Sequence, residues 1–181
     1  MTPPYFIDAP IAGVLVFCPR VALDERGSFV KSFHEGFFAG HGIQFTTREE
    51  FYSVSKKDVL RGMHFQAPPA QHSKLVTCLG GKILDVVLDL RSASPTFGRS
   101  WATELSEENH QVIYIPEGMA HGFYTLSAQS LVHYKTTSMH SPEHDRGIRW
   151  DSFSFNWPGA TPILSARDDS FPAFSAFDSP F

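Results

Sequence analysis

The sequence predicts an all-β protein, because short strand-like runs follow one another closely and almost no stretch has helical periodicity. Glycine and proline turns separate these runs, which is typical of a β-sandwich or a closed barrel. The 181 residues are 42% hydrophobic and 19% charged, a composition typical of a globular protein. We therefore expect a single domain over residues 1–181 with a sizeable core.

The first part of the chain is expected to be mostly extended. A polar turn is predicted at 24–27, and one short helix at 34–40, where glycines near both ends limit its length. The predicted strands are 13–18, 28–33, 43–55 and 59–66.

Gly80-Gly81 lies between two strand-like runs, 73–79 and 82–90, and this arrangement predicts a β-hairpin. In the second run apolar residues alternate with Asp85 and Asp89, which predicts a strand with one buried and one wet face. Further strands are expected at 101–105, 111–115, 122–126 and 130–136.

Charge and composition exclude several classes of protein. Acidic residues outnumber basic ones by 19 to 15, which argues against a nucleic-acid-binding protein. The first residues lack the pattern of a signal peptide and no apolar run has membrane-spanning length, so we expect a cytoplasmic protein without membrane contact. Cys18 and Cys78 form no metal-type pair and are interpreted as buried thiols.

Several polar residues interrupt the apolar pattern between 60 and 74, namely Arg61, His64, Gln66 and Lys74. A neutral imidazole near an ammonium group suits proton abstraction from carbon, because the cation stabilises the negative oxygen that results. The alternative is a histidine on the wet face of a strand. Strict alternation places Arg61 and His64 on opposite faces, so a shared pocket requires a bulge or twist at Gly62.

The segment 115–123 joins two predicted strands and has the spacing P-x-G-x-x-H, ending at His121. This spacing is typical of the second motif of cupin jelly rolls. Metal-binding cupins combine that histidine with an H-x-H pair, but here the corresponding residues are His64-Phe65-Gln66. Because a catalytic divalent ion usually needs three protein ligands, we expect no metal and no other cofactor.

Motifs in a fixed order resemble those of the dTDP-4-dehydrorhamnose 3,5-epimerase family from about Gly13 to about Pro172. They are DERG (24–27), KKDVLRGMHFQ (56–66), KLV (74–76), DVVLDLR (85–91), SPTFG (94–98), LSEEN (105–109), IPEGMAHGF (115–123), Tyr134-Lys135 and LSARD (164–168). The resemblance implies a cupin-type jelly roll, or double-stranded β-helix, with a few short peripheral helices. It also implies a homodimer, with Phe29 and the 171–181 tail as candidate contact pieces.

The resemblance implies an epimerase that inverts C3, C5 or both in a nucleotide-linked 4-keto-6-deoxy sugar. His64 matches the base and Asp168 the carboxylate that orients it, while Tyr134 matches the acid. Lys74 matches the group that stabilises the enolate oxygen. Taken singly, each residue has an ordinary interpretation as a solvated strand residue or a turn cap, but their joint order favours the functional one.

The resemblance also implies a set of substrate-binding residues. Arg26, Arg61 and Arg167 match basic positions suited to a diphosphate, and His121 matches a substrate contact. The full set of candidates is Arg26, Lys31, Glu49, Phe51, Arg61, Gln66, His121, His140, Asp145 and Arg167.

Three positions depart from the family at the nucleotide end. Lys31 replaces a usual glutamate, Glu49-Glu50-Phe51 replaces a usual Gln-x-Asn, and His140 takes the place of a base-stacking aromatic residue. These departures predict a changed nucleotide preference, such as CDP or GDP, and leave open a single inversion at C3 or C5. The alternatives from other classes are a non-catalytic sugar-nucleotide-binding cupin and a metal-dependent cupin oxygenase. The intact catalytic set disfavours the first alternative, and the missing H-x-H pair disfavours the second.

Overall fold

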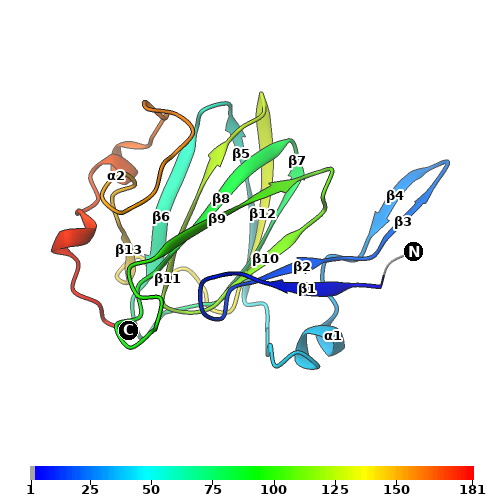
Figure 1. The fold of residues 1–181 in the computed structure, drawn as a ribbon, viewed down its shortest axis with the longest axis horizontal. Coiled ribbons are helices and arrows are strands. Elements are labelled where there is room, and N and C mark those ends of the chain that lie inside the picture. The colour runs from blue at the N-terminus through cyan, green and yellow to red at the C-terminus, as the bar shows by residue number, and fades with distance from the viewer. Residues whose placement is uncertain (1–2) are drawn as a thin grey trace.

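Two antiparallel β-sheets face each other in the computed structural model, which describes residues 3–181 (Figure 1). One sheet has the order β1 (Tyr5–Asp8), β2 (Leu15–Cys18), β10 (Val112–Ile115), β7 (Lys74–Gly80), β12 (Gln129–Thr136) and β5 (Glu49–Lys56). The other has the order β13 (Asp145–Gly147), β6 (Leu60–Gln66), β11 (Met119–Thr125), β8 (Lys82–Asp89) and β9 (Ser100–Ser106). This arrangement confirms the expected all-β jelly roll.

Small elements surround the two sheets. Strands β3 (Val21–Asp24) and β4 (Gly27–Val30) form a hairpin that projects from the body of the molecule (Figure 1). The helices are short: α1 (Glu35–Ala39), α2 (Ala166–Asp169) and the 3-10 turn η1 (Phe174–Ala176). The expected helix at 34–40 is α1, which begins where the His34 ring accepts a hydrogen bond from the amide of Phe37. No helix among residues 3–181 is long and apolar enough to span a membrane.

Apolar side chains fill the space between the sheets and also cover the outer face of the five-stranded sheet. Val76, Val87 and Ile113 belong to the inner cluster. The outer cluster includes Met63 and Leu88 and is covered by rings of the C-terminal segment, Phe174, Phe177 and Phe181. The 171–181 tail, which was expected at a subunit contact, therefore packs largely against its own sheet (Figure 1).

The prediction of a wet face on β8 is wrong. Asp85 and Asp89 both have 0% of their surface exposed. Their face of the strand points between the sheets with Ile83 and Val87, while Leu88 and its neighbours pack beneath the C-terminal segment. Because both faces of this central strand are covered, the two carboxylates are buried inside the protein.

The prediction of a hairpin at Gly80-Gly81 is also wrong. Strand β7 pairs with β10 and β12, and β8 pairs with β9 and β11, so the two runs lie in different sheets. Gly81 has φ +73°, and a Cβ atom there would lie 2.1 Å from the carbonyl oxygen of Gln129. The glycine pair thus makes a tight turn that carries the chain from one sheet to the other.

The register of β6 against β11 shifts at Gly62. His121 pairs with His64, but Phe123, two residues on, pairs with Arg61, so β6 contains one extra residue at this point. Gly62 has φ +131°, and a Cβ atom there would lie 2.5 Å from the Cα of Gly122. The bulge that the sequence required at Gly62 is present, and it turns Arg61 and His64 toward the same side of the sheet.

Candidate active site

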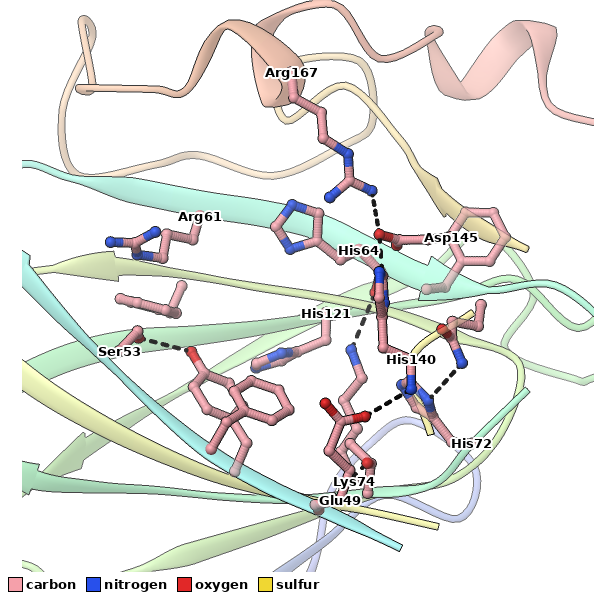
Figure 2. Close-up of a pocket in the computed structure, with 16 residues that line it drawn as sticks. Glu49, Ser53, Arg61, His64, His72, Lys74, His121, His140, Asp145 and Arg167 are labelled. Atoms are coloured by element: carbon pink, nitrogen blue, oxygen red, sulfur yellow. Dashed lines mark hydrogen bonds and ion pairs between the residues drawn. The ribbon is translucent and has the colours of Figure 1, made fainter. Parts of the chain in front are cut away.

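A cavity of about 390 Å³ opens between the two sheets (Figure 2). Strands β5, β7 and β12 line one side, while β6, β11 and β13 line the other, and α2 contributes a residue at the rim. The candidate residues that line it are Glu49, Phe51, Arg61, His64, Gln66, Lys74, His121, Tyr134, His140, Asp145 and Arg167. The fold thus brings together most of the residues that the sequence singled out.

His64 and Asp168 form an imidazole–carboxylate pair. The Nε2 atom of His64 is 2.9 Å from Oδ1 of Asp168, and the other carboxylate oxygen accepts a hydrogen bond from the amide of Gly62 at 2.9 Å. Burial opposes ionisation of Asp168, but these hydrogen bonds outweigh it and lower the pKa of the carboxyl group. An ionised carboxylate only accepts hydrogen bonds, so Nε2 carries a proton, and in the neutral ring Nδ1 holds the lone pair. His64 is thereby prepared to act as a base through Nδ1.

Tyr134 lines the cavity from the opposite sheet, on β12. Its ring stacks on Phe51 with centroids 4.7 Å apart, and its hydroxyl lies 3.4 Å from Oγ of Ser53. Burial raises the pKa of the Tyr134 hydroxyl above its ordinary value of 10.0. The phenol therefore remains protonated over the physiological pH range and can donate a proton or a hydrogen bond.

Lys74 places an ammonium group inside the cavity. Only 9% of the residue is exposed, and Nζ donates to the carbonyl oxygen of His64 at 3.3 Å. Burial lowers the pKa of Lys74 to about 8, although Asp145 and Asp85 attract the charge. The group is thus mostly a cation at neutral pH, next to the histidine that can act as a base.

Charged residues at one end of the cavity form a connected network that reaches from α2 to β5 (Figure 2). Arg167 donates from Nη2 to Asp145 Oδ2 at 2.7 Å, and the same oxygen lies 3.9 Å from the His140 ring. Glu49 accepts a hydrogen bond from the amide of His140 at 2.6 Å. Each charge at this end therefore already has a partner within the chain.

Arg61 and Gln66 differ in how many of their polar groups already bond within the chain. The Gln66 amide donates to the Ala70 carbonyl at 2.7 Å and accepts from the Ser141 amide at 2.6 Å, so it holds two loops in place. Arg61 donates from Nε to Ser55 at 2.9 Å and forms no ion pair within residues 3–181. Its guanidinium charge therefore lacks an acidic partner in this part of the chain, as does the Lys74 ammonium deeper in the cavity.

Arg26 and Lys31 do not line this cavity. Arg26 lies in the turn of the projecting β3–β4 hairpin, where its side chain is 90% exposed and pairs with Asp24. Lys31 follows β4 and lines a separate hollow with Phe29 and His34. The hairpin extends away from the two sheets (Figure 1), and neither residue lines the cavity of its own chain.

The sequence analysis did not single out three residues at the site. Asp85 bonds to His121, Ser53 lies beside the Tyr134 hydroxyl, and His72 lines the cavity. Burial, together with the charge of Lys74, lowers the pKa of His72 to about 3, so its ring is neutral. Asp85 could have been found as an acidic residue in an apolar strand. His72 could have been found because it lies two residues before Lys74, a spacing that places both on one face of an extended chain.

No group of three or more His, Cys, Asp and Glu side chains within residues 3–181 is arranged to hold a metal ion. The polar groups in the cavity bond instead to one another, as the pairs His64–Asp168 and His121–Asp85 show. The side chains present can move and stabilise protons and charges, which is the chemistry of acid–base catalysis.

Replacing Lys74 by methionine should stabilise the protein at neutral pH. The pKa of Lys74 falls from an ordinary 10.5 to about 8 on folding, so at pH 7 the buried cation costs roughly 3 kcal/mol. Between pH 8 and 10.5 the unfolded chain binds more protons, so the unfolding free energy of the wild type should rise with pH. Denaturant titrations of both proteins across this range measure the difference.

Lys56→Met provides the control, because Lys56 is exposed on β5 and its charge stays in water in the folded protein. A wild type and a Lys74→Met variant with parallel pH dependences would contradict the assignment of a destabilising buried cation.

Comparison with known proteins is consistent with this arrangement. The model of the family described as dTDP-4-dehydrorhamnose 3,5-epimerase matches residues 8–176. An enzyme of that name from Shigella flexneri is 42% identical over 167 residues, which cover 90% of this chain and 91% of the relative. A second one, from Methanothermobacter thermautotrophicus, is 41% identical over 84% of this chain and 83% of the relative.

A solved structure also superposes on nearly the whole chain. It is the dTDP-6-deoxy-D-glucose-3,5-epimerase of Legionella pneumophila in complex with dTDP-4-keto-L-rhamnose, with a TM-score of 0.92 and 35% identity. The match covers 97% of this chain and 95% of that one. Sequence, fold and the coverage of both chains agree, and the chain belongs to the dTDP-4-dehydrorhamnose 3,5-epimerase family.

Proposed function

We propose that this isomerase acts on a dTDP-linked 4-keto-6-deoxy sugar and inverts C3, C5 or both by proton transfer between His64 and Tyr134. The observation that carries the proposal is that these residues enter one cavity from different sheets, His64 on β6 and Tyr134 on β12. Inversion at carbon requires a base on one face of the sugar and an acid on the other. The entry of His64 and Tyr134 from different sheets supports this arrangement.

The reaction is a proton transfer without net oxidation or reduction. The 4-keto group acidifies the hydrogens on C3 and C5, and the Nδ1 lone pair of His64 removes one of them. The electrons of the broken C–H bond form the enolate, whose negative oxygen is stabilised by the Lys74 ammonium. Tyr134 then donates its hydroxyl proton to the opposite face of the same carbon. Proton exchange with solvent returns His64 and Tyr134 to their starting forms.

The diphosphate is expected to bind at Arg61, because its guanidinium has no acidic partner within residues 3–181. A planar guanidinium matches phosphate oxygens through paired hydrogen bonds. Arg167 is a weaker candidate because Asp145 already accepts its hydrogen bond at 2.7 Å. This assignment places the nucleotide diphosphate at the Ser53 and Arg61 end of the cavity shown in Figure 2.

The thymidine nucleotide is favoured because relatives that are about 40% identical carry dTDP in their names. The departures at Glu49 and His140 lie in the cavity and favour a different nucleotide, while Lys31 lies outside it in this chain. The sequence identity extends over most of the chain, whereas the departures are few, so we assign dTDP as the nucleotide.

Proton NMR in deuterated water tests both the substrate and the number of centres. We expect the wild type to exchange C3 or C5 hydrogens of a dTDP-linked 4-keto-6-deoxy sugar, and to act more slowly on CDP- and GDP-linked analogues. Exchange confined to one carbon would identify a single-centre epimerase. Faster exchange with the CDP- or GDP-linked sugar would show that Glu49 and His140 change the nucleotide preference. Absence of exchange with all three nucleotide sugars would contradict the proposal.

His64 and Tyr134 should have separable roles. His64→Asn should abolish exchange, because no base remains to remove the hydrogen. Tyr134→Phe should keep some exchange, because His64 can return a deuteron to the same face, while inversion falls by roughly 10²–10⁴-fold. Both variants should bind dTDP as the wild type does. A His64→Asn variant that exchanges and inverts at the wild-type rate would remove His64 from the mechanism.

We also propose that the protein is one domain, is cytoplasmic and forms a homodimer. Two unpaired cysteines, Cys18 and Cys78, suit a reducing compartment. Phe29 and Leu23 expose 68% and 76% of their surface on the projecting hairpin, and a subunit contact would cover them. Light scattering should give twice the 20.2 kDa of one chain, and the mass of a single chain would contradict the dimer.

A further inference from the structure

Two buried aspartates on one face of β8 have very different surroundings. Asp85 and Asp89 are both fully buried, four residues apart on the same strand. Asp89 accepts hydrogen bonds at both oxygens, from Arg91 at 2.9 Å and 2.8 Å and from Thr96 at 2.6 Å. It ties the loop after β8 to the sheet, which is a structural role.

Asp85 has one hydrogen bond, and it is made to a cavity residue. Its Oδ2 lies 2.8 Å from Nε2 of His121, whereas Oδ1 has no hydrogen-bond partner among residues 3–181. A buried carboxylate with an unsatisfied oxygen destabilises a fold, because its lost hydration is only partly replaced. Asp85 connects no loop, so folding does not explain it. A destabilising polar group that contacts a cavity residue points to function.

His121 is the neighbour of His64 across the strand pair. The two residues lie directly opposite each other in the register of β6 and β11, and both line the cavity. The His121 ring also contacts the Tyr134 ring edge-on, with centroids 6.2 Å apart. The cavity is therefore lined by two histidines on adjacent strands, and each pairs through Nε2 with a buried carboxylate.

The pairing determines the tautomer of His121. Oδ2 of Asp85 lies within hydrogen-bond distance of Nε2 of His121, at 2.8 Å. An ionised carboxylate accepts hydrogen bonds only, so Nε2 of His121 carries the proton. Burial lowers the pKa of His121, although Asp85 opposes this effect, so the ring is neutral and Nδ1 keeps its lone pair.

We propose that Asp85 is a positioning residue for the epimerisation, whose carboxylate fixes the His121 tautomer that presents the Nδ1 lone pair to a hydroxyl group of the sugar ring. The proposal rests on the proposed function for the identity of the ligand. A lone pair selects a hydrogen-bond donor, so it suits a sugar hydroxyl and not the ketone or a phosphate oxygen. The position beside His64 places this contact at the reacting ring.

Nitrogen-15 NMR of the wild type tests the tautomer directly, with His121→Asn used to assign the signal. We expect His121 at neutral pH to be neutral and protonated on Nε2. A ring protonated on Nδ1, or on both nitrogens, would overturn the proposal. This measurement needs no substrate, so its outcome is separate from whether the protein epimerises a dTDP-sugar.

Asp85→Asn tests the consequence for the substrate, because an amide can donate as well as accept and no longer enforces one tautomer. We expect the Nδ1-protonated form of His121 to appear and kcat/KM to fall roughly tenfold to a hundredfold. Binding of the dTDP-sugar should weaken while binding of dTDP alone stays unchanged. Wild-type kinetics together with a wild-type tautomer would overturn the proposal.

Asp89→Asn is the matched control, on the same strand, on the same face and equally buried. It should lower thermal stability but leave the His121 tautomer and the kinetics of the folded enzyme unchanged. If Asp89→Asn altered the His121 tautomer and the kinetics as Asp85→Asn does, the effect would arise from the packing of β8 and the proposal would be wrong. If Asp85→Asn does not fold, the wild-type tautomer decides the question.

Discussion

The close contact of β6 and β11 at Gly62 and Gly122 determines the geometry of the catalytic cavity. A Cβ atom at Gly62 would lie 2.5 Å from Gly122, and one at Gly122 would lie 2.7 Å from the sulfur of Met63. The two glycines allow the register shift that turns Arg61 to the same side as His64. The amide of Gly62 also bonds to Asp168, so the same backbone position orients the carboxylate that holds the base. One contact between strands thus positions both Arg61, the proposed phosphate ligand, and His64, the proposed base.

Two buried ionisable groups at the cavity have well-defined protonation states near neutral pH. Asp168 is held as a carboxylate and Tyr134 as a phenol, because hydrogen bonding and burial shift their pKa values in opposite directions. Lys74 lies between these extremes with a pKa of about 8. We propose that such a site stabilises an enolate without reorganisation, at the expense of folding stability. The half-satisfied carboxylate of Asp85 belongs to the same pattern.

The sequence predicted the features that depend on local pattern and on motif order. Period-two alternation located most strands, and the order of motifs identified His64, Lys74 and Tyr134 as residues that line one cavity. Features that depend on long-range strand pairing were mostly predicted wrongly or not at all. Gly80-Gly81 looks like a hairpin turn locally, but only the pairing of β7 with β10 and β12 shows that the strands separate.

The same limit applies to the site. The alternation in β8 correctly divided its residues between two faces, but it could not show which face is inside. The C-terminal segment covers the outer, apolar face, and Asp85 lies on the face between the sheets. Arg26 and Lys31 were grouped with the cavity by motif, whereas the course of the β3–β4 hairpin moves them away from it in the single chain. A residue's role as a base or an acid follows from its type, but its partners follow from the fold.

The central claim is that a sugar ring binds between His64 on one sheet and Tyr134 on the other. A crystal structure of the inactive His64→Asn variant with a dTDP-linked 4-keto-6-deoxy sugar tests it most directly. The account predicts C3 or C5 between residue 64 and the Tyr134 hydroxyl, with the ketone oxygen within about 3.2 Å of the Lys74 ammonium. A sugar with residue 64 and Tyr134 on the same face of the ring, or a ketone oxygen far from Lys74, would contradict it.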